Sequence, residues 1–175
     1  LYTYLWKQVV WMICVDNVTF TYKSDNSTGG VRDISFTVHD GQIVVLCGES
    51  GCGKTTLTRI INGLIPHYFE GELSGHVEID GKNISAQPLW ATAGQVGSVF
   101  QNPRSQFFNV DTTGEITFGC ENLGMPKEEI LHRLKHTSAA LKLERLLDRN
   151  IFELSGGEKQ KIACAGAFMM DPQVF

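Results

Sequence analysis

Residues 48–55, GESGCGKT, are the stretch whose residue types and spacing most directly indicate chemistry. They match the pattern G-x-x-x-x-G-K-[ST], in which glycines let successive backbone N–H groups turn inward around phosphate oxygens. Gly48, Gly51 and Gly53 supply this freedom, and a helix that starts directly behind them would add a partial positive charge. The stretch therefore predicts a phosphate-binding loop, against the alternative of a glycine-rich turn that contains GKT by chance.

Two side chains at the end of this loop have separate expected tasks. Lys54 would reach the β- and γ-phosphates of a nucleotide as a point charge. The Thr55 hydroxyl would bind Mg²⁺, which keeps most of its waters and needs few protein ligands. The other loop positions expected to line the nucleotide are Glu49, Ser50, Cys52 and Thr56. The loop alone does not identify the process, because kinases, GTPases, motors and transporters share it.

A second stretch, LSGGEKQ, predicts a helix start. Ser155 with Glu158 three residues later forms a capping-box pattern, so a helix should begin here and run through residues 159–170. Gly156 and Gly157 in its first turn each disfavour the helix by about 1 kcal/mol relative to alanine. Glycines at these positions would be useful if a ligand or partner must approach the backbone closely. This helix start is therefore a second candidate anion site. The alternative is a common capping box without ligand.

Alternating apolar residues predict antiparallel strands in the first part of the chain. Residues 15–22 and 33–41 alternate, and the polar, glycine-containing residues 23–30 between them read as a turn. Residues 76–81 predict a further strand that ends in a turn.

The elements around the phosphate loop read differently. Residues 42–48, QIVVLCG, form a continuous apolar, β-branched run typical of a strand buried on both faces, and residues 95–100 predict a second buried strand. Residues 57–66 have helical apolar spacing and end in proline. Strand, loop and helix in this order indicate an α/β protein.

From Pro103 to about Asp148 the pattern becomes helical, which implies a helical insert between strands of the sheet. Pro126 suits the first turn of a helix. The residues expected to form a partial apolar face are Ile130, Leu131, Leu134, Leu141, Leu146 and Leu147.

Composition narrows the function classes. The chain has 175 residues, 42% hydrophobic and 19% charged, which suits one ordinary domain or most of one. A net charge of −4 and the lack of a Lys/Arg run argue against nucleic acid as a partner. Five scattered cysteines without a C-x-x-C pair suggest neither disulfides nor a zinc site and fit a reducing cytosol. The apolar residues 1–15 are too short to span a bilayer, so we expect a strand preceded by an extension.

Together, GESGCGKTT and LSGGEKQ resemble the Walker A loop and the signature of the ATP-binding subunit of ABC (ATP-binding cassette) transporters, from about Met12 onward. The resemblance implies a P-loop NTPase (RecA-like) core with an N-terminal antiparallel β subdomain and an inserted α-helical subdomain. The core would cover about 12–100 and 160–175 and the helical subdomain about 101–159, with 1–11 as a non-family extension.

The resemblance also implies roles for individual residues. Tyr22 occupies the position of an aromatic that stacks on adenine, although it could be an ordinary strand aromatic. Gln101 occupies the position of the Q-loop glutamine, a catalytic residue near Mg²⁺ that couples nucleotide state to the helical insert. A head-to-tail dimer is implied, in which Ser155, Gly156 and Gly157 of one subunit close on the ATP held by Lys54 of the other.

Residues 63–84 and 100–122 resemble the energy-coupling-factor (ECF) branch of this family. That branch pairs two ATPases on a transmembrane subunit, with exchangeable binding proteins for vitamins or metal cations. The resemblance implies a peripheral location on the cytoplasmic face of the membrane.

The sequence ends where the family pattern leads into a strand that carries a Walker B Asp and a catalytic Glu, followed later by a switch His. Val174 and Phe175 would open that strand, and Asp171 precedes it and is no substitute. We therefore expect a fold that is incomplete at its C-terminus, with ATP binding but little turnover. Two alternatives remain: a DNA-repair type ATPase, which would need long coiled coils, and a small-molecule P-loop kinase, which would leave LSGGEKQ to chance.

Overall fold

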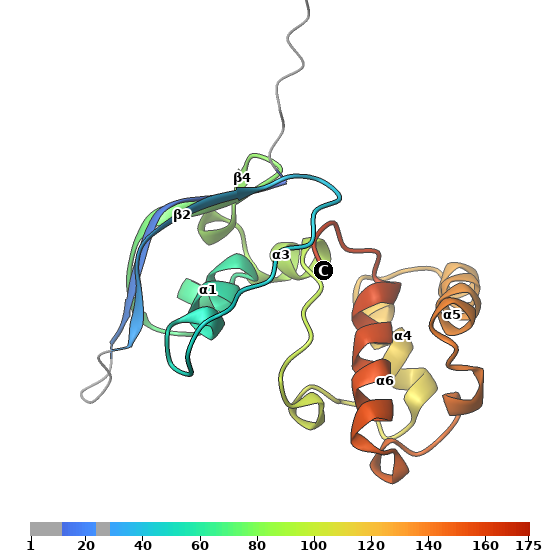
Figure 1. The fold of residues 1–175 in the computed structure, drawn as a ribbon. Helices are drawn as coiled ribbons and strands as arrows, with labels where there is room; N and C mark the ends of the chain where they lie inside the picture. Colours follow the sequence, from blue (N-terminus) through green and yellow to red (C-terminus); the bar gives the residue numbers. More distant parts are fainter. Residues whose placement is uncertain (1–11, 24–28) are drawn as a thin grey trace, which may run out of the picture. The chain divides into compact units, whose positions relative to one another are not determined.

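The computed structural model describes residues 12–23 and 29–175, which divide into two compact units (Figure 1). The first unit runs to Ala93 and the second covers Gly94–Phe175, and each is described by itself. The extension predicted at 1–11 and most of the predicted turn at 23–30 lie outside the described residues. These compact units are not family domains, so the domain boundaries predicted from the sequence stay predictions. None of the helices described is long and apolar enough to cross a bilayer.

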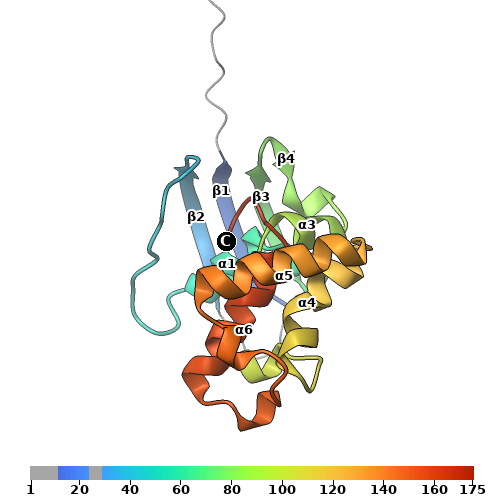
Figure 2. The ribbon, with the colours of Figure 1, turned by 90° about the vertical axis from the view of Figure 1, so that its right-hand side faces the viewer.

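The first unit contains a four-stranded antiparallel sheet in the order β2-β1-β3-β4, which Figure 2 shows side by side. The strands are β1 (Ile13–Tyr22), β2 (Gly30–Val38), β3 (Gly71–Ile79) and β4 (Lys82–Asn83). β1 lies at the centre and pairs with both β2 and β3. The antiparallel arrangement predicted from the alternating residues is confirmed.

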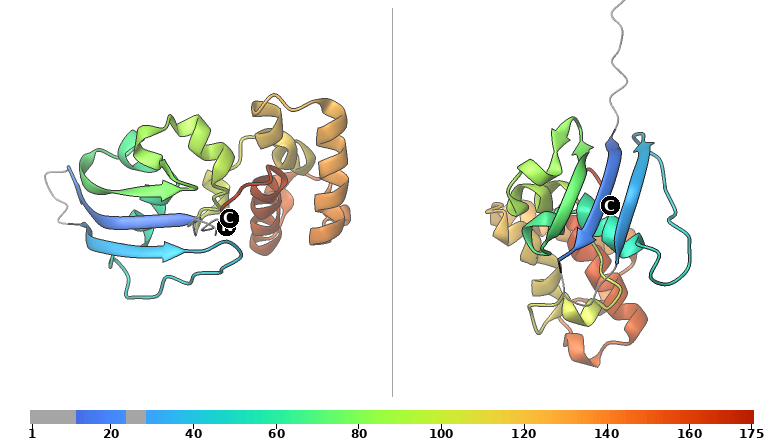
Figure 3. Two further views of the ribbon diagram at one scale, coloured as in Figure 1. Left: turned by 90° about the horizontal axis from the view of Figure 1, so that it is seen from above. Right: turned by 90° about the vertical axis from the view of Figure 1, so that its left-hand side faces the viewer.

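One face of this sheet forms the core of the first unit. Val18, Phe20 and Ile79 have no exposed side-chain surface, because alternate residues of each strand point to the same face. α1 (Lys54–Ile61) lies along this face, as Figures 1 and 3 show. Its buried residues, Leu57 and Ile60, follow the spacing of an amphipathic helix. The remaining elements of this unit are α2 (Leu64–His67), η1 (Ile84–Ala86) and most of α3 (Leu89–Gln95), whose last two residues belong to the second unit.

The predicted buried strand at residues 42–48 is wrong for this structure. These residues form no regular element, and the side chains of Ile43 and Val45 are 94% and 75% exposed. A strand buried on both faces needs hydrogen-bonded neighbours at its edges, and no described segment pairs with it. The apolar run therefore remains irregular and open to solvent.

The predicted strand at 95–100 is reduced to one parallel bridge. Val96 pairs with Val174: the Val174 N–H donates to the Gln95 carbonyl at 3.0 Å, and the Gly97 N–H donates to the Val174 carbonyl at 2.8 Å. Val174 thus has the extended, parallel pairing that its position at a strand opening predicts, and the pairing stops there.

The second unit is helical. Its main helices are α4 (Thr112–Asn122), α5 (Lys127–Leu141) and α6 (Gly156–Met169). A 3-10 turn, η2 (Pro103–Ser105), precedes α4, and two more, η3 (Glu144–Leu146) and η4 (Ile151–Glu153), lie between α5 and α6. The helical character predicted from Pro103 onward and the helix predicted from Ser155 are both confirmed.

The three helices enclose one apolar cluster, with α6 in contact with both α4 and α5. Its buried members are Ile116, Cys120, Ile130, Leu143, Leu146, Leu154, Ile162, Ala165 and Met169. Burial raises the pKa of the Cys120 thiol above its usual value, because the charged thiolate loses its hydration there. Five of the six residues of the predicted apolar face join or flank this cluster. Leu131 does not, since it is 54% exposed on the outer side of α5.

Leu143→Ala should destabilise the second unit by about 2–5 kcal/mol, because Leu143 is fully buried and the smaller side chain would leave a cavity. Leu131→Ala is the matched control and should change stability by less than about 0.5 kcal/mol. Urea unfolding followed by far-ultraviolet circular dichroism measures both. Equal losses in the two variants would contradict the described packing.

Candidate functional site

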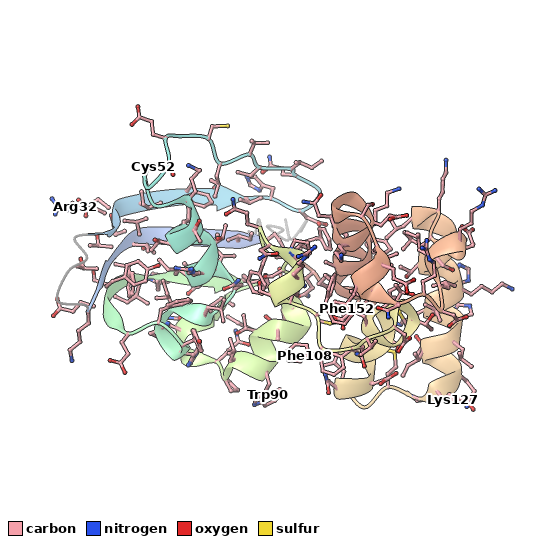
Figure 4. The ribbon with its side chains drawn as sticks, turned by 90° about the horizontal axis from the view of Figure 1, so that it is seen from below. Arg32, Cys52, Trp90, Phe108, Lys127 and Phe152 are labelled. Carbon is pink, nitrogen blue, oxygen red and sulfur yellow. The ribbon has the colours of Figure 1, made fainter. Side chains whose placement is uncertain are left out.

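The predicted phosphate loop folds around the ammonium group of Lys54. Its Nζ atom donates hydrogen bonds to the carbonyl oxygens of Gly48 at 2.8 Å and Glu49 at 2.7 Å, and lies 3.5 Å from the Cys52 sulfur. Figure 4 labels Cys52 on this loop. The Lys54 ammonium group is therefore held by the backbone of its own loop. At this position it can also contact an anion that is bound by the N–H groups of the loop.

Gly53 shows why this loop requires glycine. Its φ is +98°, and an added Cβ would lie 2.6 Å from Val31 Cγ1 and 2.9 Å from the Gly30 carbonyl oxygen. A larger residue would be strained by its backbone conformation and would collide with β2. Close passage along β2 thus fixes the position from which α1 starts.

The first N–H groups of α1 have no capping side chain, because Gly53 at the N-cap carries none. Thr55, the predicted Mg²⁺ ligand, is exposed, so its hydroxyl is accessible to an ion. One hydroxyl suits Mg²⁺, since this ion takes most of its ligands from water and phosphate. The residues present therefore fit the group that the loop predicts.

Tyr22 joins the end of β1 to α1 through its hydroxyl. The Tyr22 hydroxyl lies 3.2 Å from the Thr56 hydroxyl and accepts a hydrogen bond from Arg59 Nη1 at 3.0 Å. Arg59 also lies over the Phe69 ring, 4.1 Å from its centroid. The predicted adenine stacking of Tyr22 stays a prediction, while Thr56 has its hydroxyl committed to Tyr22. Sequence reasoning missed this cluster because 34 and 37 residues separate its members.

Gln101 is exposed in the second unit, in a loop that neighbouring side chains brace. Gln106 Nε2 donates to the Ser98 carbonyl at 3.2 Å, and Gln106 Oε1 accepts from the Phe100 N–H at 3.1 Å. Asn102 caps the turn that follows by accepting from the Arg104 N–H. Gln106 was not predicted, and the Asn-Pro turn beside it was the available sequence signal.

A buried carboxylate fixes the segment between this loop and α4. Glu115, only 7% exposed, accepts hydrogen bonds from the N–H groups of Phe108 at 2.9 Å and Asn109 at 2.8 Å. These hydrogen bonds satisfy the Oε2 atom, as a buried polar group requires. No local pattern indicated this role, because a glutamate in a helix is normally an exposed residue.

The signature stretch begins with the predicted capping box. The Ser155 hydroxyl and backbone N–H donate to Glu158 Oε2 at 2.7 and 2.8 Å, and the Glu158 N–H donates back to Ser155 Oγ at 3.3 Å. The hydrogen bonds from the Ser155 hydroxyl and then its N–H hold the pKa of the Glu158 carboxyl below its usual value, because they stabilise the charged form.

Packing within the chain does not explain Gly156 and Gly157. A Cβ added at either position would meet no atom within 4 Å, so an alanine would fit. Both residues are exposed. The two glycines therefore leave backbone accessible that a side chain would cover, as the predicted second anion site requires.

Lys159 supports this helix start from the buried side. It is 3% exposed, and its Nζ donates to the carbonyl oxygens of Leu154 at 2.7 Å and Phe152 at 3.3 Å. It thus ties α6 to the turn that carries Ser155. Its role was not predicted, although helical spacing places Lys159 on the same face as the buried Ile162 and Ala163.

The predicted site residues fall into two groups. Tyr22 and the phosphate loop with Lys54 belong to the first unit, and Gln101 and the signature residues from Ser155 belong to the second. Each group is described within its own unit, and the role of each residue stays a prediction. No group of three or more His, Cys, Asp or Glu side chains that could hold a metal ion occurs in residues 12–23 and 29–175.

Comparison with known proteins points to one family. The model of a family described as ABC transporter matches residues 31–175. A Treponema denticola protein that carries the name ABC transporter ATP-binding protein is 52% identical over 164 residues, 94% of this chain. An energy-coupling factor transporter ATP-binding protein of Lactococcus lactis subsp. cremoris is 35% identical over 91% of this chain. The chain spans about a third (33%) of the Treponema protein and 56% of the Lactococcus protein.

Among solved structures, cbiO1 from Clostridium perfringens, described as part of the ABC transporter complex cbiONQ, superposes with a TM-score of 0.77. It is 27% identical, and the match covers 93% of this chain and 62% of that one. The similarity supports the P-loop NTPase fold class predicted from the sequence.

Lys159→Met should destabilise the second unit by about 1–3 kcal/mol, because the buried Leu154 carbonyl and the partly buried Phe152 carbonyl would lose their donor. Lys161→Met, two residues further on the exposed side of α6, should have little effect. Urea denaturation of both variants measures the difference. If Lys159→Met is as stable as the unaltered chain, the two hydrogen bonds contribute nothing.

Acid should weaken the start of α6. Because the folded pKa of Glu158 is lowered, its contribution is fully present above the unfolded pKa, near 4.5, and is lost as pH falls through the folded value. Glu158→Gln should reduce the pH dependence of unfolding in this range, whereas Glu153→Gln in the preceding exposed turn should retain it. Thermal melts from pH 3 to 6 compare the variants, and identical profiles would refute this role of Glu158.

Proposed function

We propose, on the premise that this chain belongs to the ABC transporter family, that it binds Mg²⁺–ATP through residues 48–55 as the ATP-binding subunit of a transporter. The observation that carries the proposal is the position of the Lys54 ammonium group inside the loop. A nucleotide would offer the same cation charged oxygens in place of two neutral carbonyls, and charge-assisted hydrogen bonds are the stronger ones.

Each part of the loop has a distinct task in this binding. Lys54 would bind the β- and γ-phosphates, and the N–H groups at the start of α1 would bind phosphate oxygens without competition from a capping side chain. The exposed Thr55 hydroxyl would hold Mg²⁺, which supplies charge neutralisation between the phosphates. Tyr22 would stack on adenine, with its hydroxyl anchored by Thr56 and Arg59. Gln101 keeps the coupling and Mg²⁺ role that the resemblance implies.

The signature residues would act on ATP held by a second ATPase subunit, a copy of this chain or a related one. Gly156 and Gly157 leave the backbone open to an approaching phosphate, and Ser155 stands at the N-cap of α6. ATP between two such subunits would stabilise a closed head-to-tail dimer, because it contacts both only in that state. The accessible glycines support this proposal.

The transporter would be an importer of the ECF type that takes up a vitamin or a metal cation. The 35% identity with an energy-coupling factor transporter protein and the similarity to cbiO1 support this branch. The chain would then sit at the cytoplasmic face of the membrane, bound to a transmembrane subunit that selects the substrate. No observation favours a DNA-repair ATPase, since the longest helix in the described residues has 15 residues and forms no extended coiled coil.

ATP hydrolysis belongs to the family, and we propose that these 175 residues by themselves bind ATP with little turnover. The general base expected after the strand that opens at Val174 is not among them. Positioning and charge neutralisation would remain, and a residue to orient the attacking water would be missing.

Lys54→Ala should weaken ATP binding by about tenfold to a hundredfold, because charge-assisted hydrogen bonds to the phosphates are lost. Lys82→Ala, on the exposed strand β4 of the same unit, is the charge-matched control and should bind as the unaltered chain does. AMP should respond little to either change, since it has no β- or γ-phosphate. Calorimetric titration with each nucleotide, with phosphate release measured in parallel, tests the proposal.

If Lys54→Ala binds ATP as tightly as Lys82→Ala does, the phosphate loop is not the binding site. Phosphate release at the rate of a full-length relative would instead overturn only the expectation of low turnover. The binding measurement and the phosphate-release measurement therefore test the two expectations independently.

A further inference from the structure

α5 carries two exposed histidines one helical turn apart, His132 and His136. Their Nε2 atoms lie 3.2 Å from each other, and their ring centroids are 4.4 Å apart with an interplanar angle of 54°. Residues four apart on a helix are neighbours on its surface, so the two rings can approach each other there. Neither histidine has a part in the proposed ATP site.

The separation of these nitrogens fits two ligands of one metal ion. Imidazole–zinc bonds are about 2.0–2.1 Å long, so two such bonds at the tetrahedral angle place their nitrogens about 3.3–3.4 Å apart. At a right angle, bonds of that length place the nitrogens about 2.8–3.0 Å apart. The observed 3.2 Å lies between the two geometries. An ion could therefore bind both rings with small side-chain adjustments.

We propose that His132 and His136 chelate a divalent transition metal of the nickel, copper and zinc group. Neutral imidazole is a ligand that these metals favour, whereas Mg²⁺ and Ca²⁺ prefer oxygen. Water would complete the coordination, because the described residues offer no group of three or more ligating side chains. The site is distinct from the Mg²⁺–ATP loop and takes a different class of ion.

The helix presents this pair in a fixed arrangement. Buried Ile130, Thr137 and Ser138 hold α5 against the rest of its unit, so the two histidines project from an anchored backbone. Arg133, next to His132, is turned toward α6: its guanidinium donates to the Met169 carbonyl at 3.2 Å and to Glu129 at 2.8 Å. A pre-ordered pair loses little side-chain freedom when the ion binds.

The same contact without metal is a hydrogen bond, in which one Nε2–H donates to the other nitrogen. Metal binding would take the place of that shared proton, which moves through solvent to the Nδ1 atom of the same ring, so both imidazoles stay neutral while both Nε2 atoms become ligands. The chelate would also favour the helical form of residues 132–136, since only a helical turn brings the two rings together.

Nickel titration of the 175-residue chain tests the site, with a phosphine reductant to keep the five cysteines reduced. The unaltered chain should bind Ni²⁺ at this site and gain thermal stability from it. His132→Gln and His136→Gln should each weaken Ni²⁺ binding by at least about tenfold and abolish the thermal gain, because a single imidazole remains. Calorimetry measures the affinity, and far-ultraviolet circular dichroism confirms that each variant is folded.

His76→Gln is the matched control. His76 lies 3.6 Å from Glu78 on β3, so this variant shows what an ordinary surface pair contributes. It should bind Ni²⁺ as the unaltered chain does. The proposal is overturned if the His132→Gln, His136→Gln double variant keeps the affinity of the unaltered chain, or if His76→Gln loses as much affinity as the single α5 variants.

Discussion

The first N–H groups of any α-helix have no intrahelical acceptor, and both candidate nucleotide sites of this chain are built on that constraint. α1 follows Gly53, whose missing side chain leaves its first turn without a cap. α6 starts with the Ser155–Glu158 capping box and then places two open glycines in its first turn. One helix start therefore has no side-chain cap to compete with an external anion, whereas the other is capped within the chain and still has an accessible backbone.

Each helix start is held in place by close packing or hydrogen bonds with another part of its unit. Gly53 passes so close to β2 that no side chain would fit, while Tyr22 and Arg59 connect β1 with α1. In the second unit, the buried ammonium group of Lys159 binds the carbonyls that precede Ser155. Rigid surroundings of this kind preserve the geometry of a site that depends mainly on backbone groups.

Elements that depend on local chemistry were predictable from the sequence. Alternation predicted the paired β1 and β2, and the Ser155–Glu158 spacing predicted a capping box that the structure shows in full. The strand predicted at residues 42–48 did not form, because an apolar run indicates a preference for burial but does not provide the neighbouring strands that would bury it. Lys159 lies within the LSGGEKQ stretch, and Tyr22 was singled out by the resemblance to the family. The hydrogen bonds of Tyr22 depend on how segments distant in the sequence meet, and a short sequence pattern does not contain that information.

The irregular, exposed segment that includes Ile43 and Val45 has a consequence for handling the protein in solution. Its two β-branched side chains are strongly exposed, and its backbone is not paired with any strand in the described part of the chain. Exposed β-branched side chains beside unpaired backbone groups favour pairing with a strand of another chain, which makes this segment a natural starting point for aggregation. The same segment leads directly into Gly48 and the phosphate loop. Self-association through this segment would therefore block the candidate nucleotide site as well as lower the concentration of dissolved protein.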